Sequence, residues 1–206
     1  MVITIGRTFG SGGRMMGKEL AKRLGIKFYD AELIRLVSDE TGISEGLFGE
    51  TNERLMKSYL GQNLTWMEDP TPFPPSSKKY TSEENLFRLN AKLIRELADK
   101  EDCVIMGRCG ATVLGGRPDV VRLFCYASPE NCTKRAMEVC GLSEKDAVKR
   151  IAEVDKYRDS YHKHFTGKKI NDATNYDLCI NTGSASVEDL VDFVCSYIDK
   201  RKSIKA

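Results

Sequence analysis

The first 24 residues constrain the fold most strongly, because a short apolar run, a glycine-rich turn and a helical repeat follow one another there. Residues 2–5 are β-branched and mostly apolar, which predicts a buried strand. The four-residue spacing of Met16, Leu20 and Leu24 predicts a helix. The turn between them contains four glycines: Gly6, Gly10, Gly12 and Gly13. This order of elements directs free backbone N–H groups and the positive end of a helix toward a bound phosphate.

The glycine turn departs from the usual phosphate-binding signature, G-x-x-x-x-G-K-[ST]. When the two are aligned on the G-S-G segment, Gly13 stands at the lysine position, followed by Arg14, and Met15 stands at the hydroxyl position. The dinucleotide pattern G-x-G-x-x-G fails as well, since it would end on Met15. We interpret the turn as a phosphate-binding loop of altered sequence. The alternative is a glycine-rich turn that binds nothing.

The composition is typical of a soluble globular domain. Of the 206 residues, 41% are hydrophobic and 30% are charged, and the net charge is only +2. Because no basic stripe is present, nucleic acid is not expected as a partner. No apolar run approaches the roughly 18 residues of a membrane span, and the amino end lacks the features of a signal peptide, so no membrane association is expected.

The seven cysteines form no C-x-x-C pair, and the chain has only two histidines. This pattern argues against a zinc site, and no metal ligand is assigned. Several cysteines lie within apolar runs, where a free thiol behaves as a small buried hydrophobe. The pattern favours a reducing compartment, and we expect a cytoplasmic protein.

The rest of the chain alternates between expected strands and expected helices. Four further strands are predicted at residues 26–29, 103–106, 120–126 and 178–182. Helices are predicted over residues 31–41, after a capping box at residues 81–84, and from serine N-caps at Ser128, Ser143 and Ser186. Strands separated by helices indicate an α/β fold with three layers, in which helices cover both faces of a five-stranded parallel sheet.

Residues 43–80 form the least regular part of the chain. Four of the six prolines, at positions 70, 72, 74 and 75, lie close to the only tryptophan, Trp66. The segment is too long for a simple connection, so it is a candidate lid or acceptor-binding insertion. A disordered segment without a function is the alternative.

Polar residues follow several of the expected strands directly. In a parallel sheet of this kind, ligands bind at the carboxyl ends of the strands. We therefore expect the glycine loop, Asp30, Arg108 and the turn after Thr182 to lie close together. The alternative for Asp30 is an N-cap of the following helix.

Three arginines are candidates for binding phosphates during phosphoryl transfer, which depends mainly on cations and on positioning. Arg14 begins the first helix and could replace the missing lysine, Arg108 follows a buried strand, and Arg158 lies on the helix that begins near Ser143. For Arg158, a simple i,i+3 ion pair with Asp155 is the alternative.

His162 and His164 have no partner serine or cysteine motif and are expected on the surface, along with the rest of a polar helix face.

Five segments together resemble one known family. Residues 2–34 contain I-G-R-T-F-G-S-G-G-R, and further matches lie at 105–114 (I-M-G-R-C-G), 127–135 (A-S-P-E-N-C-T-K-R), 155–161 (D-K-Y-R-D-S-Y) and 176–183 (Y-D-L-C-I-N-T-G). In this order and spacing they resemble the cytidylate kinase-like proteins, a branch of the P-loop nucleoside monophosphate kinases. The resemblance covers nearly the whole chain apart from residues 43–80.

The resemblance implies a single P-loop kinase-like domain over residues 1–206. It also implies transfer of a phosphoryl group from ATP with Mg²⁺ to a nucleoside monophosphate, CMP or dCMP by analogy. The helices of residues 128–170 would bear a lid. The implied site residues are Gly10, Ser11, Gly12, Gly13 and Arg14 for the donor phosphates, Asp30, Arg108 and Asp155 for the acceptor, and Arg135 and Arg158 in the lid. Arg14, Arg108 and Arg158 would be the catalytic cations.

The sequence departs from the family pattern at positions that carry charge. Gly13, Arg14 and Met15 replace the loop lysine and the hydroxyl residues, Cys109 follows Arg108 where the family has aspartate, and Cys132 replaces an arginine. Two alternatives therefore stay open. One is a nucleotide-binding module without catalysis, and the other is a kinase for a different small acceptor. No oligomeric state is predicted.

Overall fold

Five parallel strands form the central sheet of the protein. The structure is a computed structural model that describes residues 1–48 and 64–205. The strand order is β2-β3-β1-β4-β5, and every neighbouring pair is parallel. The strands are β1 Val2–Arg7, β2 Lys27–Tyr29, β3 Cys103–Met106, β4 Val120–Tyr126 and β5 Leu178–Asn181. The predicted α/β fold with a five-stranded parallel sheet is confirmed.

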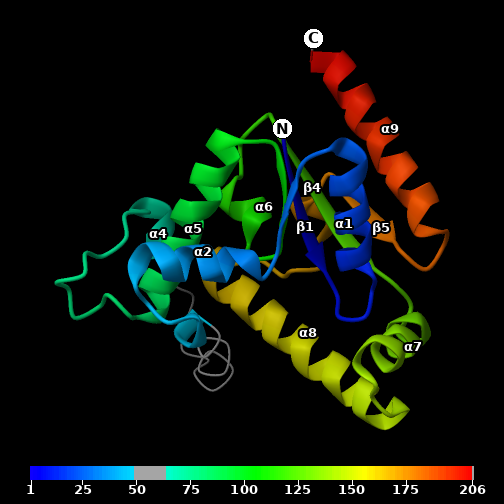
Figure 1. The fold of residues 1–206 in the computed structure, drawn as a ribbon, viewed down its shortest axis with the longest axis horizontal. Helices are drawn as coiled ribbons and strands as arrows, with labels where there is room; N and C mark the ends of the chain where they lie inside the picture. The colour runs from blue at the N-terminus through cyan, green and yellow to red at the C-terminus, as the bar shows by residue number, and fades with distance from the viewer. Residues whose placement is uncertain (49–63, 206) are drawn as a thin grey trace.

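Helices cover both faces of this sheet (Figure 1). On one face, α1 Gly13–Leu24 and α9 Val187–Lys205 pack on Ile3 and Ile5 of the central strand. On the other face, α2 Glu32–Thr41, α5 Glu83–Lys100 and α6 Gly110–Val113 enclose a second core that includes Val2. Since successive side chains of a strand point to opposite faces, the continuous apolar run of β1 supplies both cores.

Serine caps fix the beginning of most of the later helices. Ser128 begins α7 Pro129–Cys140 and Ser143 begins α8 Glu144–Thr166, each accepting a backbone N–H bond from three residues further on. Ser186 accepts the same bond from Asp189 at 3.1 Å before α9. These predicted caps are confirmed. Helix α5 differs by one residue from the expected capping box, because its N-cap is Ser82.

Residues 64–80, the described part of the chain that contains the four prolines, contact the second core. Trp66, in the short helix α4 Thr65–Glu68, donates its indole N–H to the Phe165 carbonyl at 2.6 Å and contacts the Phe87 ring. Asn85 of α5 binds the backbone of Phe73 on both its N–H and its carbonyl. Residues 49–63 lie outside the described residues, so a lid or acceptor-binding role for residues 43–80 stays a prediction.

Cys103, Cys109, Cys125 and Cys132 are buried free thiols, whereas Cys140 and Cys179 are exposed and Cys195 is partly buried. The first four pack as small hydrophobes, as predicted, but Cys179 in β5 does not. Among the described helices, none combines the length and the apolar character that crossing a bilayer would require.

Candidate functional site

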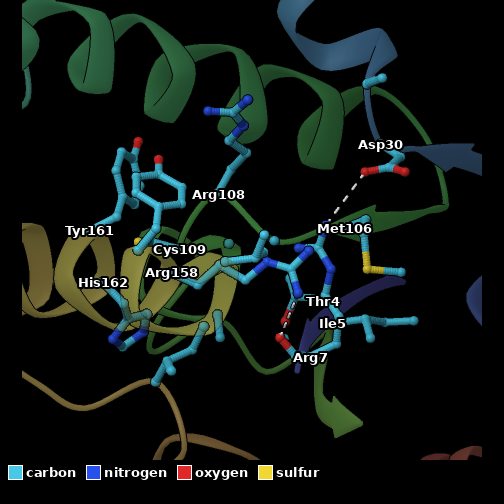
Figure 2. Close-up of a pocket in the computed structure, with 18 of the residues that line it drawn as sticks. Thr4, Ile5, Arg7, Asp30, Met106, Arg108, Cys109, Arg158, Tyr161 and His162 are labelled. Carbon is cyan, nitrogen blue, oxygen red and sulfur yellow. Dashed lines mark hydrogen bonds and ion pairs between the residues drawn. The ribbon is translucent and has the colours of Figure 1, made fainter. Parts of the chain in front are cut away.

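A cavity of about 370 Å³ lies at the carboxyl edge of the sheet, where β1 and β3 end beside α8 (Figure 2). Three of the predicted site residues line it: Asp30, Arg108 and Arg158. Arg7, at the end of β1, lines it as well. Gly6 lines the cavity, whereas residues 10–14, Arg135 and Asp155 do not. The cavity therefore joins residues that are far apart in the sequence, as the sheet topology predicts.

The glycine loop begins where β1 ends, and it leads into α1. Gly10 and Gly12 have φ angles of +72° and +81°, which lie in the left-handed region that favours glycine. A Cβ on Gly10 would lie 2.4 Å from the Cys132 carbonyl oxygen, so this position also requires the absence of a side chain. Gly12 is the N-cap of α1 and provides no side-chain bond to the helix. The Gly13 N–H donates to the Ser11 hydroxyl at 3.4 Å. The positive end of α1 as a whole still favours an anion at this loop.

Three side chains hold this loop in place. Arg135 donates to the Ser11 carbonyl at 2.6 Å and to the Thr182 carbonyl at 2.7 Å. The Thr182 hydroxyl also donates to the Ser11 carbonyl. From α8, Asp155 accepts the Phe9 N–H at 2.7 Å. The loop is therefore tied to β5, α7 and α8 at the same time. Arg135 thus contacts the loop backbone at Ser11. Its predicted role in a lid stays a prediction.

Asp30 lies between two arginines. Its carboxylate accepts a bond of 2.5 Å from the Arg14 Nε, and its other oxygen lies 3.8 Å from an Arg7 Nη. The N-cap of α2 is Ala31, without a side-chain bond, so the alternative of Asp30 as an N-cap is wrong. The Arg14 side chain is 59% exposed and does not line the cavity. Its predicted role as a phosphate cation stays a prediction.

The turn after β3 is strained. Gly107, Arg108 and Cys109 all have positive φ angles, of +73°, +52° and +55°. For residues with a Cβ this conformation costs on the order of 1 kcal/mol each. The turn places Arg108 on the cavity wall, and Figure 2 shows its side chain extending away from Arg7 and Arg158. Such strain is found where a side chain must be held in a defined direction.

Arg158 connects α8 to the end of β1. Its Nη1 donates to the Arg7 carbonyl at 3.3 Å and lies 3.7 Å from an Asp155 carboxylate oxygen. Burial lowers the pKa of Arg158, while Asp155 and Asp30 raise it. Burial raises the pKa of Asp155, against the opposing effects of the Phe9 N–H and of Arg158. The predicted ion pair of Asp155 and Arg158 is present, and both residues also bind the backbone around the glycine loop.

Sequence reasoning missed Arg7. Its guanidinium extends from β1 across the end of β3, and a Cβ on Gly107 would lie only 2.3 Å from its Nη1. Burial lowers the pKa of Arg7 to about 10, with nearby Arg158 as the next cause. Thr4 of the same strand lines the cavity too, and among the described residues its buried hydroxyl has no hydrogen-bond partner. The only signal in the sequence was the place of Arg7 between a strand and the glycine loop.

His162 is not on the surface as expected. Its side chain is 4% exposed, and its Nδ1 lies 2.8 Å from the Lys168 carbonyl and 3.0 Å from the Thr166 hydroxyl. The chain beyond α8 turns back over the helix end and covers this ring. Burial lowers the pKa of His162, so its neutral form is favoured. His164 is partly buried against the Phe165 ring.

The side chains around the loop do not fit a magnesium ion held by protein ligands. Met15 stands where a hydroxyl ligand is expected, and the hydroxyl of Ser11 donates to the Thr8 carbonyl at 2.9 Å. The nearest carboxylates, Asp30 and Asp155, already bind arginines or backbone N–H groups. Within residues 1–48 and 64–205, no group of three metal-ligating side chains is found. Any magnesium ion in this site would depend on ligand oxygens and water.

The family comparison matches most of the chain. A model of the cytidylate kinase-like family matches residues 2–184. A cytidylate kinase from Methanopyrus kandleri is 24% identical over 208 residues, covering 97% of this chain and 93% of that protein. A uronate isomerase from Corynebacterium glutamicum is 29% identical over 154 residues, or 71% of this chain. The chain spans only 29% of the length of that isomerase.

Solved structures share the fold. A crystal structure of an uncharacterized protein from Eubacterium ventriosum is 28% identical, with a TM-score of 0.71 and coverage of 97% of this chain and 98% of that one. A shikimate kinase from Bacteroides thetaiotaomicron is 14% identical, with a TM-score of 0.55 and the same coverages of 97% and 98%. At this identity, the second likeness concerns the fold alone.

Proposed function

The chain belongs to the cytidylate kinase-like family and has the P-loop kinase fold, and on that premise we propose that it transfers a phosphoryl group from ATP to a nucleoside monophosphate. CMP and dCMP are the first candidates for the acceptor, because relatives matched over most of their own length are named cytidylate kinases. Donor and acceptor would meet where the glycine loop adjoins the cavity.

One observation carries this proposal, namely the excess of positive charge in the cavity. Of the residues that the structure describes, four arginines line it, Arg7, Arg108, Arg150 and Arg158, against a single carboxylate, Asp30, which Arg14 also binds. A cavity of this charge beside a helix N-terminus favours a ligand with several phosphates. Enclosure by the sheet and α8 strengthens each of these interactions, because the local dielectric constant is lower than that of water.

In the proposed step, an oxygen of the acceptor phosphate forms a bond to the γ-phosphorus of ATP, and the bond from that phosphorus to the ADP oxygen breaks. ADP and a nucleoside diphosphate leave. The backbone N–H groups of residues 10–14 would hold the donor phosphates, and Arg108 and Arg158 would stabilise the charge on the transferred group. Asp30, held by Arg14, would position the acceptor.

A binding module without catalysis is the second candidate, and one observation favours it. The loop has no space for the usual lysine, because a Cβ on Gly13 would lie 2.8 Å from the Cys125 Cβ. A module of this kind would still bind ATP through the loop backbone.

A panel of nucleoside monophosphates with ATP and Mg²⁺, assayed for ADP release, separates the two candidates. We expect release above the ATPase background with at least one acceptor, and with CMP or dCMP first. Calorimetry with ATP completes the test. ATP binding without acceptor-dependent ADP release would support the binding module and contradict the kinase.

A further inference from the structure

Arg7 occupies space that two glycines leave open. A Cβ on Gly13 would lie 3.1 Å from the Arg7 Cβ, and a Cβ on Gly107 would lie 2.3 Å from the Arg7 Nη1. The stem of Arg7 thus passes the position where the usual loop lysine begins, and its guanidinium lies over the end of β3. In this backbone, a side chain at position 13 would crowd the arginine at position 7. The placement of Arg7 therefore depends on glycine at position 13 of the altered loop sequence.

The guanidinium of Arg7 has hydrogen-bond donors without acceptors among the described residues. It carries five N–H donors, yet among residues 1–48 and 64–205 it donates no hydrogen bond. The closest carboxylate oxygen, on Asp30, is 3.8 Å away. The side chain is only 21% exposed, so water can satisfy few of these donors. A largely buried cation with free donors that face a cavity is suited to binding an anion.

The charges around Arg7 also favour the binding of an anion. Burial lowers the pKa of Arg7 most, Arg158 and Arg108 lower it further, and Asp30 raises it. Asp155 also faces this charge, since Arg7 lowers the pKa of Asp155, although Asp155 is itself bound to the Phe9 N–H and close to Arg158. Since Asp30 is already bound to Arg14 at 2.5 Å, it compensates Arg7 incompletely. Arg14 differs in both respects, because its side chain is 59% exposed and its Nε has a carboxylate partner.

We propose that Arg7, rather than Arg14, is the cation that replaces the loop lysine, and that its guanidinium binds a phosphate group of the ligand in the cavity. The identity of that group as a nucleotide phosphate rests on the proposed kinase function. The binding of a phosphate anion by Arg7 does not. A planar guanidinium can bind two phosphate oxygens at once, which an ammonium group cannot do in the same fixed geometry.

Three variants test this inference: Arg7→Met, Arg7→Lys and, as a control, Arg23→Met. Arg23 lies in the last turn of α1 and pairs with Asp192 of α9. Calorimetric titration with inorganic pyrophosphate, without nucleotide, measures phosphate binding, and thermal denaturation measures stability. We expect Arg7→Met to weaken pyrophosphate binding at least tenfold while its Tm stays equal or rises, because a poorly compensated buried cation has been removed. Arg7→Lys should recover part of the affinity, and Arg23→Met should bind as the wild type does.

Unchanged pyrophosphate affinity in Arg7→Met would overturn the inference, whatever happens to its Tm. If the Tm of Arg7→Met falls together with its affinity, Arg7→Lys decides. A partial recovery of affinity supports phosphate binding by Arg7, and no recovery means that the residue is structural. The kinase proposal fails separately. If the wild-type protein turns over no acceptor, but Arg7→Met binds pyrophosphate less tightly than the wild type does, the kinase proposal is refuted and the inference about Arg7 stands.

Discussion

Two turns at the same edge of the sheet differ in which residues adopt positive φ angles. The loop after β1 has its positive φ angles at glycines, Gly10 and Gly12, and it is held by distant side chains. The turn after the neighbouring strand β3 has positive φ angles at Arg108 and Cys109, where the backbone is strained. The first turn leads into the N-terminus of α1. The second places one arginine on the cavity wall and buries the cysteine that follows it.

The difference indicates which turn tolerates a change. Under the proposed function, the glycine loop would act through its backbone path, so an added side chain should damage both stability and binding. The turn after β3 would act through the Arg108 side chain, so a change to glycine should relax the backbone and remove activity at the same time. The first two predictions below each test one part of this contrast.

The largest expected effect is that of Gly10→Ala. Its Cβ would meet the Cys132 carbonyl oxygen at 2.4 Å, and its φ of +72° disfavours any residue with a Cβ. We expect a loss of about 3 kcal/mol in the free energy of unfolding, measured with urea, and a large loss of ATP affinity. Gly116→Ala is the matched control, because Gly116 has a φ of +81° but faces open space. It should lose only about 1 kcal/mol. Equal losses in both variants would contradict a crowded loop.

A smaller effect on stability is expected for Arg108→Gly. Relief of the left-handed strain gains about 1 kcal/mol or more, and glycine loses part of that gain through its flexible unfolded state, which leaves a net rise of roughly 0.5 kcal/mol. The same variant should lower kcat/KM at least tenfold, because the guanidinium is gone. Arg108→Ala separates the two effects, since it should lose the activity without the gain in stability. A stabilised Arg108→Gly enzyme with full activity would exclude Arg108 from the site.

The smallest effect concerns His162, which lines the cavity from α8 and belongs to neither turn. Burial lowers its pKa from the ordinary 6.5. Below about pH 6.5 the unfolded chain therefore binds a proton that the folded chain resists, so the free energy of unfolding falls as the pH falls. His162→Gln should remove this part of the acid sensitivity. Urea denaturation at pH 7.5 and pH 5.5 measures it, and identical pH dependence in both proteins would contradict a buried neutral histidine.

Most of the sheet could be predicted because the strands are short and largely apolar, and most later helices begin at a serine cap. Asp30 and Arg108 could be placed at the cavity from strand ends alone. Arg7 could not, because its direction depends on Gly107, which is 100 residues away in the chain, and on Gly13. The burial of His162 was also missed, because the segment that covers it belongs to no helix or strand and carries no periodic pattern.

The transfer of labelled phosphate tests the kinase most directly. The purified protein would be mixed with ATP labelled in its γ-phosphate, Mg²⁺ and CMP or dCMP, and the products would be separated. We expect the label to appear in the nucleoside diphosphate in step with the ADP formed, and to fall sharply in Gly10→Ala. Label that stays in ATP, or that appears only as inorganic phosphate, with every acceptor tried would contradict phosphoryl transfer by this site.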